Sequence, residues 1–273
     1  MEIREITSRQ NKLVRRAAAL GEDAAARREQ GLFLCEGARL CQDAALSGVE
    51  VEACFFTRRG EERYGQYLQP VLERAREAYR VEDHVAQLLS STKNGQGVFC
   101  LCRRPEGLGA GLSGRELSGP CLVLEQLQDP GNLGTVLRTA EALGVGQVFL
   151  LGECCDPLSP KVLRASMGAV FRLRLGAEPE AGPLCAALRG QGYGLHAAVV
   201  DGDAVPVTQL DLARGKQAVF IGNEGNGLRP ETVALCGSRV TIPMAGRAES
   251  LNASAAATIL LWEMTRGRGR RDG

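Results

Sequence analysis

Downstream of residue 120, short apolar runs of strand type alternate with segments whose apolar residues recur at helical spacing. The strands are expected at Cys121–Leu124, Gln147–Leu151, Phe171–Leu175, Tyr193–Val200, Ala218–Ile221 and Arg239–Ile242. The helices are expected at Leu133–Leu143, Pro160–Ala169, Pro183–Arg189, Pro230–Leu235 and Asn252–Thr265. This alternation predicts an α/β domain whose sheet is parallel and covered by helices on both faces.

Residues 1–105 show a similar alternation on a smaller scale. Ser8 is the expected N-cap of a basic helix that has Asn11 in its first turn. Ala24–Gln30 is polar and has no clear period. The other elements are expected as helices at Glu36–Leu46, Tyr64–Ala78 and Val81–Ser90, and as strands at Gly31–Leu34, Val51–Thr57 and Gly97–Arg103. The pattern predicts a small, self-contained α/β domain.

The segment between these two regions, RRPEGLGAGLSGRELSGP, is rich in glycine and has no sustained period. Such composition is typical of a linker. We therefore predict one domain at 1–105, a linker at 106–119 and a second domain at 120–273. The alternative is an ordered surface loop within one large domain.

Composition and charge are those of an ordinary globular protein, with 44% hydrophobic residues and a net charge of +1. Net charge gives no argument for nucleic-acid binding, which would need a local basic patch. The first residues, MEIREITSRQNK, lack the apolar stretch of a signal peptide, and no apolar run approaches the roughly 18 residues of a membrane helix. We expect a cytoplasmic protein without a membrane partner.

The ten cysteines form no CxxC pair, and only His84 and His196 could add imidazole ligands. A free thiol within an apolar run behaves as a small hydrophobic side chain. We therefore expect reduced thiols and no metal site. The cysteines within such runs are Cys54, Cys100, Cys102, Cys121, Cys185 and Cys236.

A glycine-rich loop, GNEGNG at residues 222–227, directly follows the apolar run Ala218–Ile221. Glycine lets the backbone approach a ligand closely, and open α/β sheets bind ligands at the carboxyl ends of their strands. The loop is not the G-x-G-x-x-G dinucleotide fingerprint, and no G-x-x-x-x-G-K-[ST] sequence or glycine-framed catalytic serine occurs. A ligand pocket is predicted, with NAD and ATP disfavoured.

The first strand of this region leads into a helix that has one apolar stripe. Asn132 is its expected cap, and Arg138 faces away from the stripe together with Thr135 and Ala142. One interpretation is an amphipathic helix with a solvated arginine. The other is that Asn132 and Arg138 line a polar cleft at the helix N-terminus, where anions such as phosphate bind well.

Three loops in register change this interpretation. NLGTVLR at 132–138, IGNEGNGL at 221–228 and IPMAGRAESLNAS at 242–254 resemble the three motifs of the SpoU, or TrmH-like, ribose 2′-O-methyltransferases of the SPOUT superfamily. The resemblance covers about residues 120–267. The N-terminal segments ITSRQNKLVRRAAAL and GLFLCEGARLCQDA look like the RNA-binding substrate domain of that family, which has an L30-like α/β fold. The turn Asn94-Gly95-Gln96 departs from the Thr-Pro-Gln that is frequent there.

The resemblance implies a parallel-sheet SPOUT domain with an α/β trefoil knot that binds S-adenosylmethionine (SAM). Its cofactor contacts correspond to Gly222, Ile242 and Leu251. The small residues Ala253, Ala255 and Ala256 would let the last helix pack closely under the glycine loop.

The implied reaction is the transfer of the SAM methyl group to a ribose 2′-hydroxyl, without a metal. The residues that correspond to the catalytic set of the family are Asn132, Arg138, Glu224, Ser250 and Asn252. In the family, the arginine that Arg138 matches is assigned the activation of the hydroxyl. A guanidinium is normally too weak a base, so binding the neighbouring phosphate is the alternative role. Glu224 has its own alternative role, as an acceptor for the backbone amides of its loop.

The resemblance implies an obligate homodimer whose active site takes residues from both copies. Ribosomal RNA, and 23S rRNA in particular, is the expected substrate. The alternatives are a tRNA 2′-O-methyltransferase and a catalytically silent RNA-binding or ribosome-assembly factor on the same fold. The candidate phosphate contacts are Arg9, Lys12, Arg15 and Arg16 in the first helix region and Arg266, Arg268, Arg270 and Arg271 in the tail, each with a solvated surface charge as the alternative.

Overall fold

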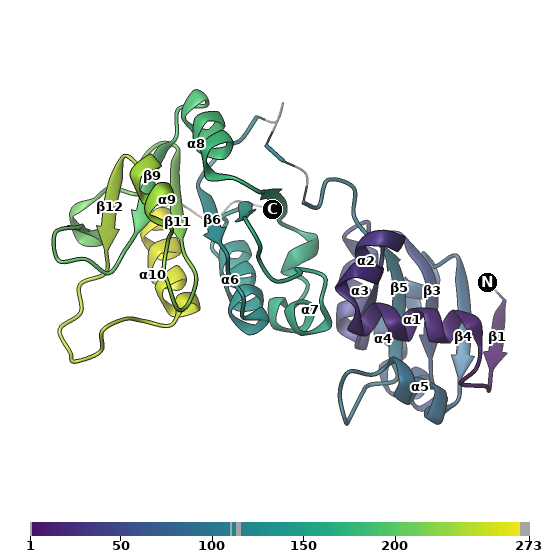
Figure 1. Ribbon diagram of the computed structural model, residues 1–273. Helices are drawn as coiled ribbons and strands as arrows, with labels where there is room; N and C mark the ends of the chain where they lie inside the picture. The colour runs from purple at the N-terminus through teal and green to yellow at the C-terminus, as the bar shows by residue number, and fades with distance from the viewer. Residues whose placement is uncertain (1, 110, 113–115, 268–273) are drawn as a thin grey trace. The chain divides into compact units, whose positions relative to one another are not determined.

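A computed structural model describes residues 2–109, 111–112 and 116–267 of the chain. The chain forms two compact units (Figure 1). The N-terminal unit consists of Met1–Glu106 and Asp156–Phe171, and the C-terminal unit of Gly107–Cys155 and Arg172–Gly273. The division of the sequence at 1–105, 106–119 and 120–273 remains a prediction, and it did not anticipate that residues 156–171 pack with the N-terminal unit.

The N-terminal unit is built on a mixed five-stranded sheet of order β1-β4-β3-β5-β2. Strands β1 and β3 run parallel to β4, whereas β5 is antiparallel to both β3 and β2. The strands are β1 (Ile3–Ile6), β2 (Leu32–Glu36), β3 (Val51–Phe56), β4 (Glu77–Val81) and β5 (Val98–Arg103). The helices are α1 (Lys12–Glu22), α2 (Ala24–Gln30), α3 (Ala38–Leu46), α4 (Arg58–Leu72) and α5 (Asp83–Leu89).

The N-cap of α1 is Asn11, so the prediction of Ser8 as the cap was wrong. The Asn11 side-chain oxygen accepts hydrogen bonds from the backbone N–H groups of Leu13 at 2.9 Å and Val14 at 3.3 Å. Only the residue directly before the first helical turn can reach these amides. Ser8 lies one turn earlier, where its carbonyl accepts from the N–H of Asn11.

The helix expected at Tyr64–Ala78 begins earlier and ends earlier than predicted. Thr57, which the prediction assigned to a strand, is the N-cap of α4, and its hydroxyl accepts from the Gly60 N–H at 3.0 Å. The last two residues of the expected helix instead begin β4, which runs to Val81 and whose buried and half-exposed residues alternate partly as strand residues do. Strand β1 and helix α2 were not predicted.

Residues 156–171 add helix α7 (Pro160–Ser166) and a 3-10 turn, η1 (Ala169–Phe171), to the N-terminal unit. Arg27 of α2 is only 4% exposed and donates from Nε to the carboxylate of Asp156 at 2.6 Å. Its NH1 group also donates to the Leu20 carbonyl at 2.7 Å. The rings of Phe33 and Phe171 pack with their centroids 5.9 Å apart. A buried ion pair and an aromatic contact therefore hold this segment.

The C-terminal unit is built on a seven-stranded sheet of order β10-β12-β9-β11-β6-β7-β8, in which every neighbouring pair is parallel. The predicted α/β fold with a parallel sheet is confirmed. Its strands are β6 (Cys121–Glu125), β7 (Gln147–Leu151), β8 (Arg174–Glu178), β9 (Gly194–Ala198), β10 (Val205–Pro206), β11 (Gln217–Ile221) and β12 (Ser238–Thr241). Its helices are α6 (Pro130–Ala142), α8 (Ala181–Gly190), α9 (Pro230–Leu235) and α10 (Ala253–Thr265), with a 3-10 turn η2 (Val207–Gln209).

Helices cover both faces of this sheet, as the sequence predicted. On one face, side chains such as Val123 and Phe220 form a buried cluster with Leu184 and Leu188 of α8. Successive strand residues point to opposite faces, so the buried Leu122 and its equivalents face the other side, where α6 and α10 pack against each other.

Two predicted elements of this region were displaced. Phe171 belongs to η1, and the strand expected at Phe171–Leu175 starts instead at Arg174. The helix expected to reach Ala169 ends at Ser166 because Met167 adopts a left-handed conformation with φ of 50°. Strand β10, which has only two residues, was not predicted.

All ten cysteines, each within the described residues, are free thiols. Seven of them are buried in the cores of the two units. Burial raises the pKa of the Cys121 thiol and of Cys41, which favours the neutral, unreactive form. Cys41 and Cys121 are therefore packing residues, as expected for thiols within apolar surroundings. No helix within the described residues is both long and apolar enough to cross a membrane.

Asp156→Ala would leave the buried guanidinium of Arg27 without its charged partner. Removal of one member of a buried ion pair costs about 3–5 kcal/mol, and we expect a loss near the lower end because Arg27 keeps its bond to the Leu20 carbonyl. Urea denaturation measures the loss. Glu73→Ala, which removes an exposed pair with Arg74, should cost less than about 1 kcal/mol. Equal losses for the two variants would contradict this assignment.

Candidate active site

A cavity of about 400 Å³ opens at the carboxyl ends of β9, β11 and β12, three neighbouring strands of the C-terminal sheet. Its walls come from residues 198–200, the glycine loop 221–227, residues 240–244 and 250–251, and the first turns of α10. The three predicted cofactor residues, Gly222, Ile242 and Leu251, all line this cavity. Two of the predicted catalytic residues, Glu224 and Ser250, lie in its wall as well.

The glycine loop folds back on itself at Gly222. A Cβ atom at this position would lie 2.0 Å from the carbonyl carbon of Gly227, so no side chain fits. Asn223 and Gly227 exchange two backbone hydrogen bonds at 2.9 and 3.0 Å. The side-chain oxygen of Asn223 accepts from the N–H of Gly225 at 2.8 Å, and its amide nitrogen donates to the carbonyl of Gln126. The loop is therefore closed by its own contacts.

Helix α10 begins under this loop. Asn252 is its N-cap and accepts from the Ser254 N–H at 2.9 Å. Ala253 and Ala256 line the cavity as the sequence predicted. The expectation that Ala255 also packs under the loop was wrong, because Ala255 lies on the exposed side of the helix. Residues that follow each other in a helix are about 100° apart, so the three alanines cannot share one face.

A chain of hydrogen bonds joins the three motif loops beside the cavity. Asn132 donates from Nδ2 to Glu224 Oε1 at 3.2 Å, and Asn252 donates from Nδ2 to Asn132 Oδ1 at 3.0 Å. Glu224 also accepts from the backbone N–H groups of Asp129 at 3.0 Å and Gln128 at 3.3 Å. These bonds fix the orientation of both amide groups. We call this set of three side chains, Glu224, Asn132 and Asn252, the motif network.

The motif network favours the ionised form of Glu224. Burial by itself raises the pKa of this carboxyl, but its own backbone N–H, Asn132 and the amides of Asp129 and Gln128 donate to it and leave the pKa lowered. A carboxylate with a lowered pKa that already accepts these bonds is a poor proton acceptor. Glu224 therefore holds the loop 128–132 in place. The alternative role of Glu224, as an acceptor for backbone amides, fits these contacts. The donors include amides of the loop 128–132 and not only those of its own loop.

Asn132 does not cap α6, in contrast to the prediction. Asp129 is the N-cap, and its side chain accepts from the Asn132 N–H at 2.7 Å, with Pro130 in the first turn. The sequence Asp-Pro at the start of a helix is the stronger signal, because proline fits the first helical position. The Asn132 side chain is thereby available to Glu224 and Asn252.

Arg138 lies six residues after Asn132 on α6, about 9 Å further along the helix axis. It is exposed, as are Thr135 and Ala142, so the predicted outward face is confirmed. Arg138 is absent from the lining of the cavity. The structure thus brings Asn132, Glu224 and Asn252 together, and it leaves Arg138 on the outer surface of the same unit.

A buried carboxylate that the sequence reasoning missed lies behind the site. Glu125, the last residue of β6, is 0% exposed and accepts from the backbone N–H and Nε of Arg229 and from the Thr232 hydroxyl at 2.9, 2.8 and 2.6 Å. Its hydrogen bond to Arg229 raises the pKa of that guanidinium. The glutamate fixes the start of α9 beside the glycine loop. A charged residue at the end of a fully apolar strand is the signal that would have indicated it.

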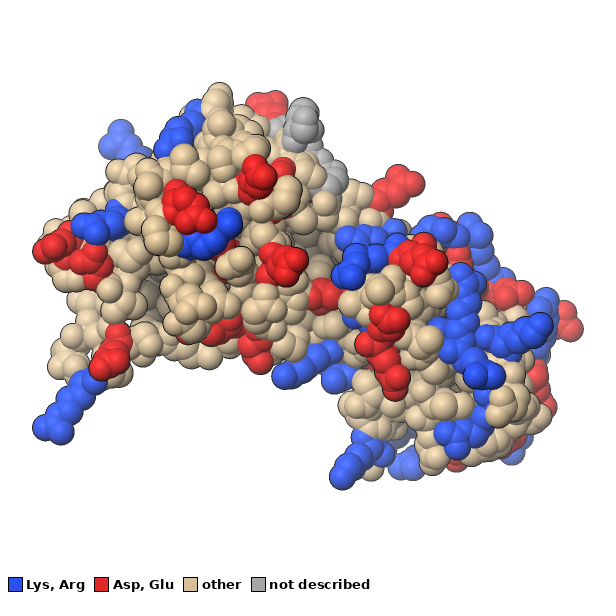
Figure 2. Space-filling view, viewed as in Figure 1, with Lys and Arg blue, Asp and Glu red and all other residues tan. Residues whose placement is uncertain are grey.

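The predicted RNA contacts of the N-terminal unit are all exposed. Arg9 precedes α1, and Lys12, Arg15 and Arg16 belong to it. In Figure 2, Lys and Arg side chains spread over the face of this unit on which α1 lies. Among the tail arginines, Arg266 pairs with Glu263 at 2.8 Å, while Arg268, Arg270 and Arg271 lie outside the described residues. No group of His, Cys, Asp or Glu side chains within the described part of the chain is arranged to hold a metal ion.

Comparison with known proteins gives the family. Residues 119–262 match the SpoU rRNA Methylase family, and residues 11–100 match the MRM3-like substrate binding domain. This chain belongs to the SpoU rRNA methylase family. The predicted family is confirmed, and with it the predicted enzyme class of SAM-dependent methyltransferases.

Relatives and solved structures agree with this assignment over most of the chain. A protein of Synechocystis sp. named as an uncharacterized tRNA/rRNA methyltransferase is 34% identical, over 97% of this chain and 94% of its own. The 23S rRNA guanosine 2′-O-methyltransferase RlmP of Bacillus subtilis is 27% identical, over 87% and 90%. The crystal structure of an AdoMet-bound rRNA methyltransferase from Sinorhizobium meliloti superposes with a TM-score of 0.87 at 28% identity, over 98% and 99%. The AdoMet-bound structure supports the prediction that SAM is the methyl donor.

Gly222→Ala should weaken SAM binding. The added Cβ would meet the Gly227 backbone at 2.0 Å, and overpacking of this kind costs about 1–3 kcal/mol, which corresponds to roughly 10- to 100-fold in affinity. Isothermal titration with SAM measures it. Gly225→Ala is the control in the same loop, because its nearest neighbour would lie at an ordinary 3.5 Å, and its affinity should be unchanged. A folded Gly222→Ala protein with normal SAM affinity would contradict the close approach.

Proposed function

We propose that this protein transfers the methyl group of SAM to a ribose 2′-hydroxyl of ribosomal RNA, in 23S rRNA. The observation that carries the proposal is the motif network, which joins three loops distant in sequence at the edge of a ligand-sized cavity. Cavities that bind small ligands are about 300–1,000 Å³, so this one is large enough for a cofactor. The related 23S rRNA 2′-O-methyltransferases support the choice of substrate. The protein would then act in the compartment that contains this RNA. From the sequence we expect this compartment to be the cytoplasm.

The residues that line the cavity are suited to bind SAM. Ile242, Leu251 and Leu260 offer apolar contact for an adenine ring, and the glycine loop offers backbone groups at its edge. When bound, the cofactor supplies an electrophilic methyl group on sulfur. Gly222, Ile242 and Leu251 would hold it, and we propose that the segments around them form the trefoil knot of the family.

The side chains at the edge of the cavity would position the ribose. Ser250 lines the cavity, and Asn252 and Asn132 are fixed by the motif network. Methyl transfer needs the acceptor oxygen in line with the donor, and holding reactants in that geometry is itself a large part of catalysis. The network would therefore orient the acceptor, with no proton moved by Glu224.

Arg138 would act through its positive charge. A guanidinium does not lose its proton in proteins, so it is not the base. Beside the 2′-hydroxyl it would bind the adjacent phosphate and make loss of the hydroxyl proton easier. Its position on the outer face of α6 means that it meets RNA bound at that surface or the site of a second copy.

The exposed face of α10 supports a homodimer. Trp262 is 58% exposed and Ile259 37% exposed, and Ala255 and Thr258 lie on the same side at helical spacing. Exposed apolar patches of this kind mark interaction surfaces. Helix α10 packs against α6, the helix that carries Arg138. A second copy docked on this pair of helices would place Arg138 at the interface, where it completes a site shared by two chains.

The N-terminal unit would bind the RNA substrate. It matches a substrate-binding domain, and its exposed basic residues, Arg9, Lys12, Arg15 and Arg16, can contact phosphates. A substrate domain of this type favours rRNA over tRNA, because the similar 23S rRNA enzyme RlmP aligns with 87% of this chain.

Transfer of label from methyl-tritiated SAM to unmodified 23S rRNA tests the proposed activity. We expect transfer by the wild type, mapped to a ribose 2′-oxygen. Arg138→Ala should lose activity by about 100-fold or more, as for other groups that stabilise developing charge, with SAM affinity unchanged because Arg138 is not part of the cavity. Arg214→Ala, an exposed arginine of the same unit, is the control. A wild type that binds RNA and SAM without transfer would instead support the silent assembly factor.

Trp262→Glu should convert the dimer to a monomer, because it places a charge at the centre of the apolar face of α10. Sedimentation velocity measures the mass, and activity should fall together with dimer content. Leu46→Glu changes an equally exposed leucine (56%) on α3 of the N-terminal unit and should leave the mass unchanged. A wild type that is monomeric at micromolar concentration would refute the proposed dimer.

A further inference from the structure

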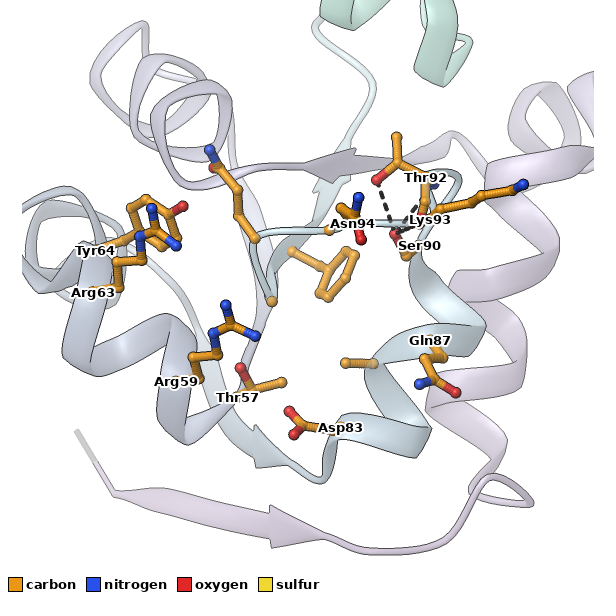
Figure 3. Close-up of a pocket in the computed structure, with 15 residues that line it drawn as sticks. Thr57, Arg59, Arg63, Tyr64, Asp83, Gln87, Ser90, Thr92, Lys93 and Asn94 are labelled. Carbon is orange, nitrogen blue, oxygen red and sulfur yellow. Dashed lines mark hydrogen bonds between the residues drawn. The ribbon is translucent and has the colours of Figure 1, made fainter.

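A second cavity, of about 390 Å³, lies within the N-terminal unit, and no role has yet been given to it. It opens where β3 and β4 end, between α4, α5 and the loop that joins α5 to β5 (Figure 3). The predicted RNA contacts on α1 and just before it are not among its lining residues.

Polar and charged side chains line this second cavity. Arg59, Arg63 and Lys93 supply positive charge, and none of the three forms an ion pair or side-chain hydrogen bond to another described residue. In Figure 3, the guanidinium of Arg59 points toward the middle of the group, whereas Lys93 extends away from it. The guanidinium carbon of Arg63 lies 5.6 Å from the ring centroid of the half-buried Tyr64. Cations beside an aromatic ring are the elements of a nucleotide site.

The opposite side of the cavity carries hydrogen-bonding groups suited to the edge of a base. Asn94 points inward from the loop, Gln87 comes from α5, and Asp83 lies beside Thr57 at the base of the group in Figure 3. An amide both donates and accepts, and a carboxylate accepts from the amino groups of bases.

Contacts among the lining residues and with Glu36 behind them hold the cavity in shape. Gly97 has a φ of 68° and approaches Thr57 so closely that an added Cβ would lie 2.4 Å from its hydroxyl. The buried carboxylate of Glu36, at the end of β2, accepts from the hydroxyls of Ser90 and Ser91 and from the Ser91 N–H at 2.9 Å. Glu36 thus fixes the start of the loop that carries Lys93 and Asn94.

We propose that this cavity binds one unpaired nucleotide of the RNA substrate. This inference rests on the proposed function, which supplies RNA as the ligand. Arg59 and Arg63 bind the phosphate of the nucleotide, the base stacks on Tyr64, and Asn94, Gln87 and Asp83 contact its edge. The site is separate from the cavity for the cofactor, whose lining is mostly backbone and aliphatic side chains.

An unpaired nucleotide suits the cavity better than a duplex. Proteins contact double-stranded RNA along its shallow groove and phosphates, whereas recognition by stacking and by the base edge needs a base that is turned out of the helix. A recess of this volume, lined by the half-buried ring of Tyr64, the buried ring of Phe99 and two cations of α4, has room for one nucleotide and not for a paired strand. The site would therefore select RNA loops or bulges.

The test compares two variants with matched controls in full-length protein. Tyr64→Ala removes the stacking surface, and Tyr64→Phe keeps it. Arg59→Ala/Arg63→Ala removes two charges from the cavity, and Arg28→Ala/Arg74→Ala removes two exposed charges elsewhere on the same unit. The measurements are the Kd for a short single-stranded oligoribonucleotide by fluorescence anisotropy, its salt dependence, and kcat and KM for methyl transfer to unmodified 23S rRNA. Thermal melting verifies that each variant is folded.

We expect Tyr64→Ala to raise the Kd and the RNA KM by about 10-fold, as for the removal of one stacked base, with kcat and the SAM KM unchanged. Tyr64→Phe should behave as the wild type. The double arginine variant should weaken binding and reduce the salt slope by about one for each phosphate that is no longer bound, whereas its control should keep both. Crosslinking of thiouridine-substituted RNA should label the peptide that contains Tyr64.

Equal RNA binding by Tyr64→Ala and Tyr64→Phe, or equal effects of the two arginine pairs, would overturn the proposal. Competition by duplex RNA as strong as that by the single strand would overturn it too. These outcomes are distinct from a failure of the proposed function, in which the wild type binds RNA but transfers no methyl group. In that case the binding and crosslinking measurements still decide on the cavity.

Discussion

The C-terminal site depends on one carboxylate that receives hydrogen bonds from segments far apart in the chain. Glu224 accepts from two backbone amides of the loop after β6 and from Asn132, and Asn132 in turn accepts from the cap of α10. Because each amide group can be oriented in only one way within this series, the positions of the three loops determine one another. Contacts within the protein therefore hold the three loops together, and preorganisation of this kind reduces the cost of ordering a site on binding.

Two buried carboxylates at strand ends hold loops of this protein in a similar way. Glu36, the last residue of β2, accepts hydrogen bonds from the loop beside the second cavity. Glu125, the last residue of β6, accepts hydrogen bonds from Arg229 and Thr232. Buried carboxylates are costly unless they are fully hydrogen-bonded. Their presence at loops that form cavities, and their complete set of donors, indicate that these loops are held in one conformation by polar contacts where apolar packing ends.

The sequence predicted the central strands and the cavity well, because both follow from local pattern. A short, fully apolar run between turn signals, such as Cys121–Leu124, favours a buried strand, and the glycine loop needs close backbone contact at Gly222. Strands β1 and β4 were missed because their charged, alternating residues give little apolar signal. A charged residue at the end of an apolar strand indicates a buried carboxylate, but the hydrogen-bond partners of Glu36 and Glu125 could not be predicted, since they lie 54 to 107 residues away. Nothing local in the sequence encodes these partners.

The inclusion of residues 156–171 in the N-terminal unit has a consequence for the modular use of this protein. The chain passes from one unit to the other three times, after Glu106, after Cys155 and after Phe171. A cut in the glycine-rich segment would therefore not separate the units, and a fragment that ended there would lack the carboxylate of Asp156 that its Arg27 requires. Any exchange of the N-terminal unit, in evolution or by engineering, must therefore include α7. The coding sequence of this unit is split into two separate stretches of the gene.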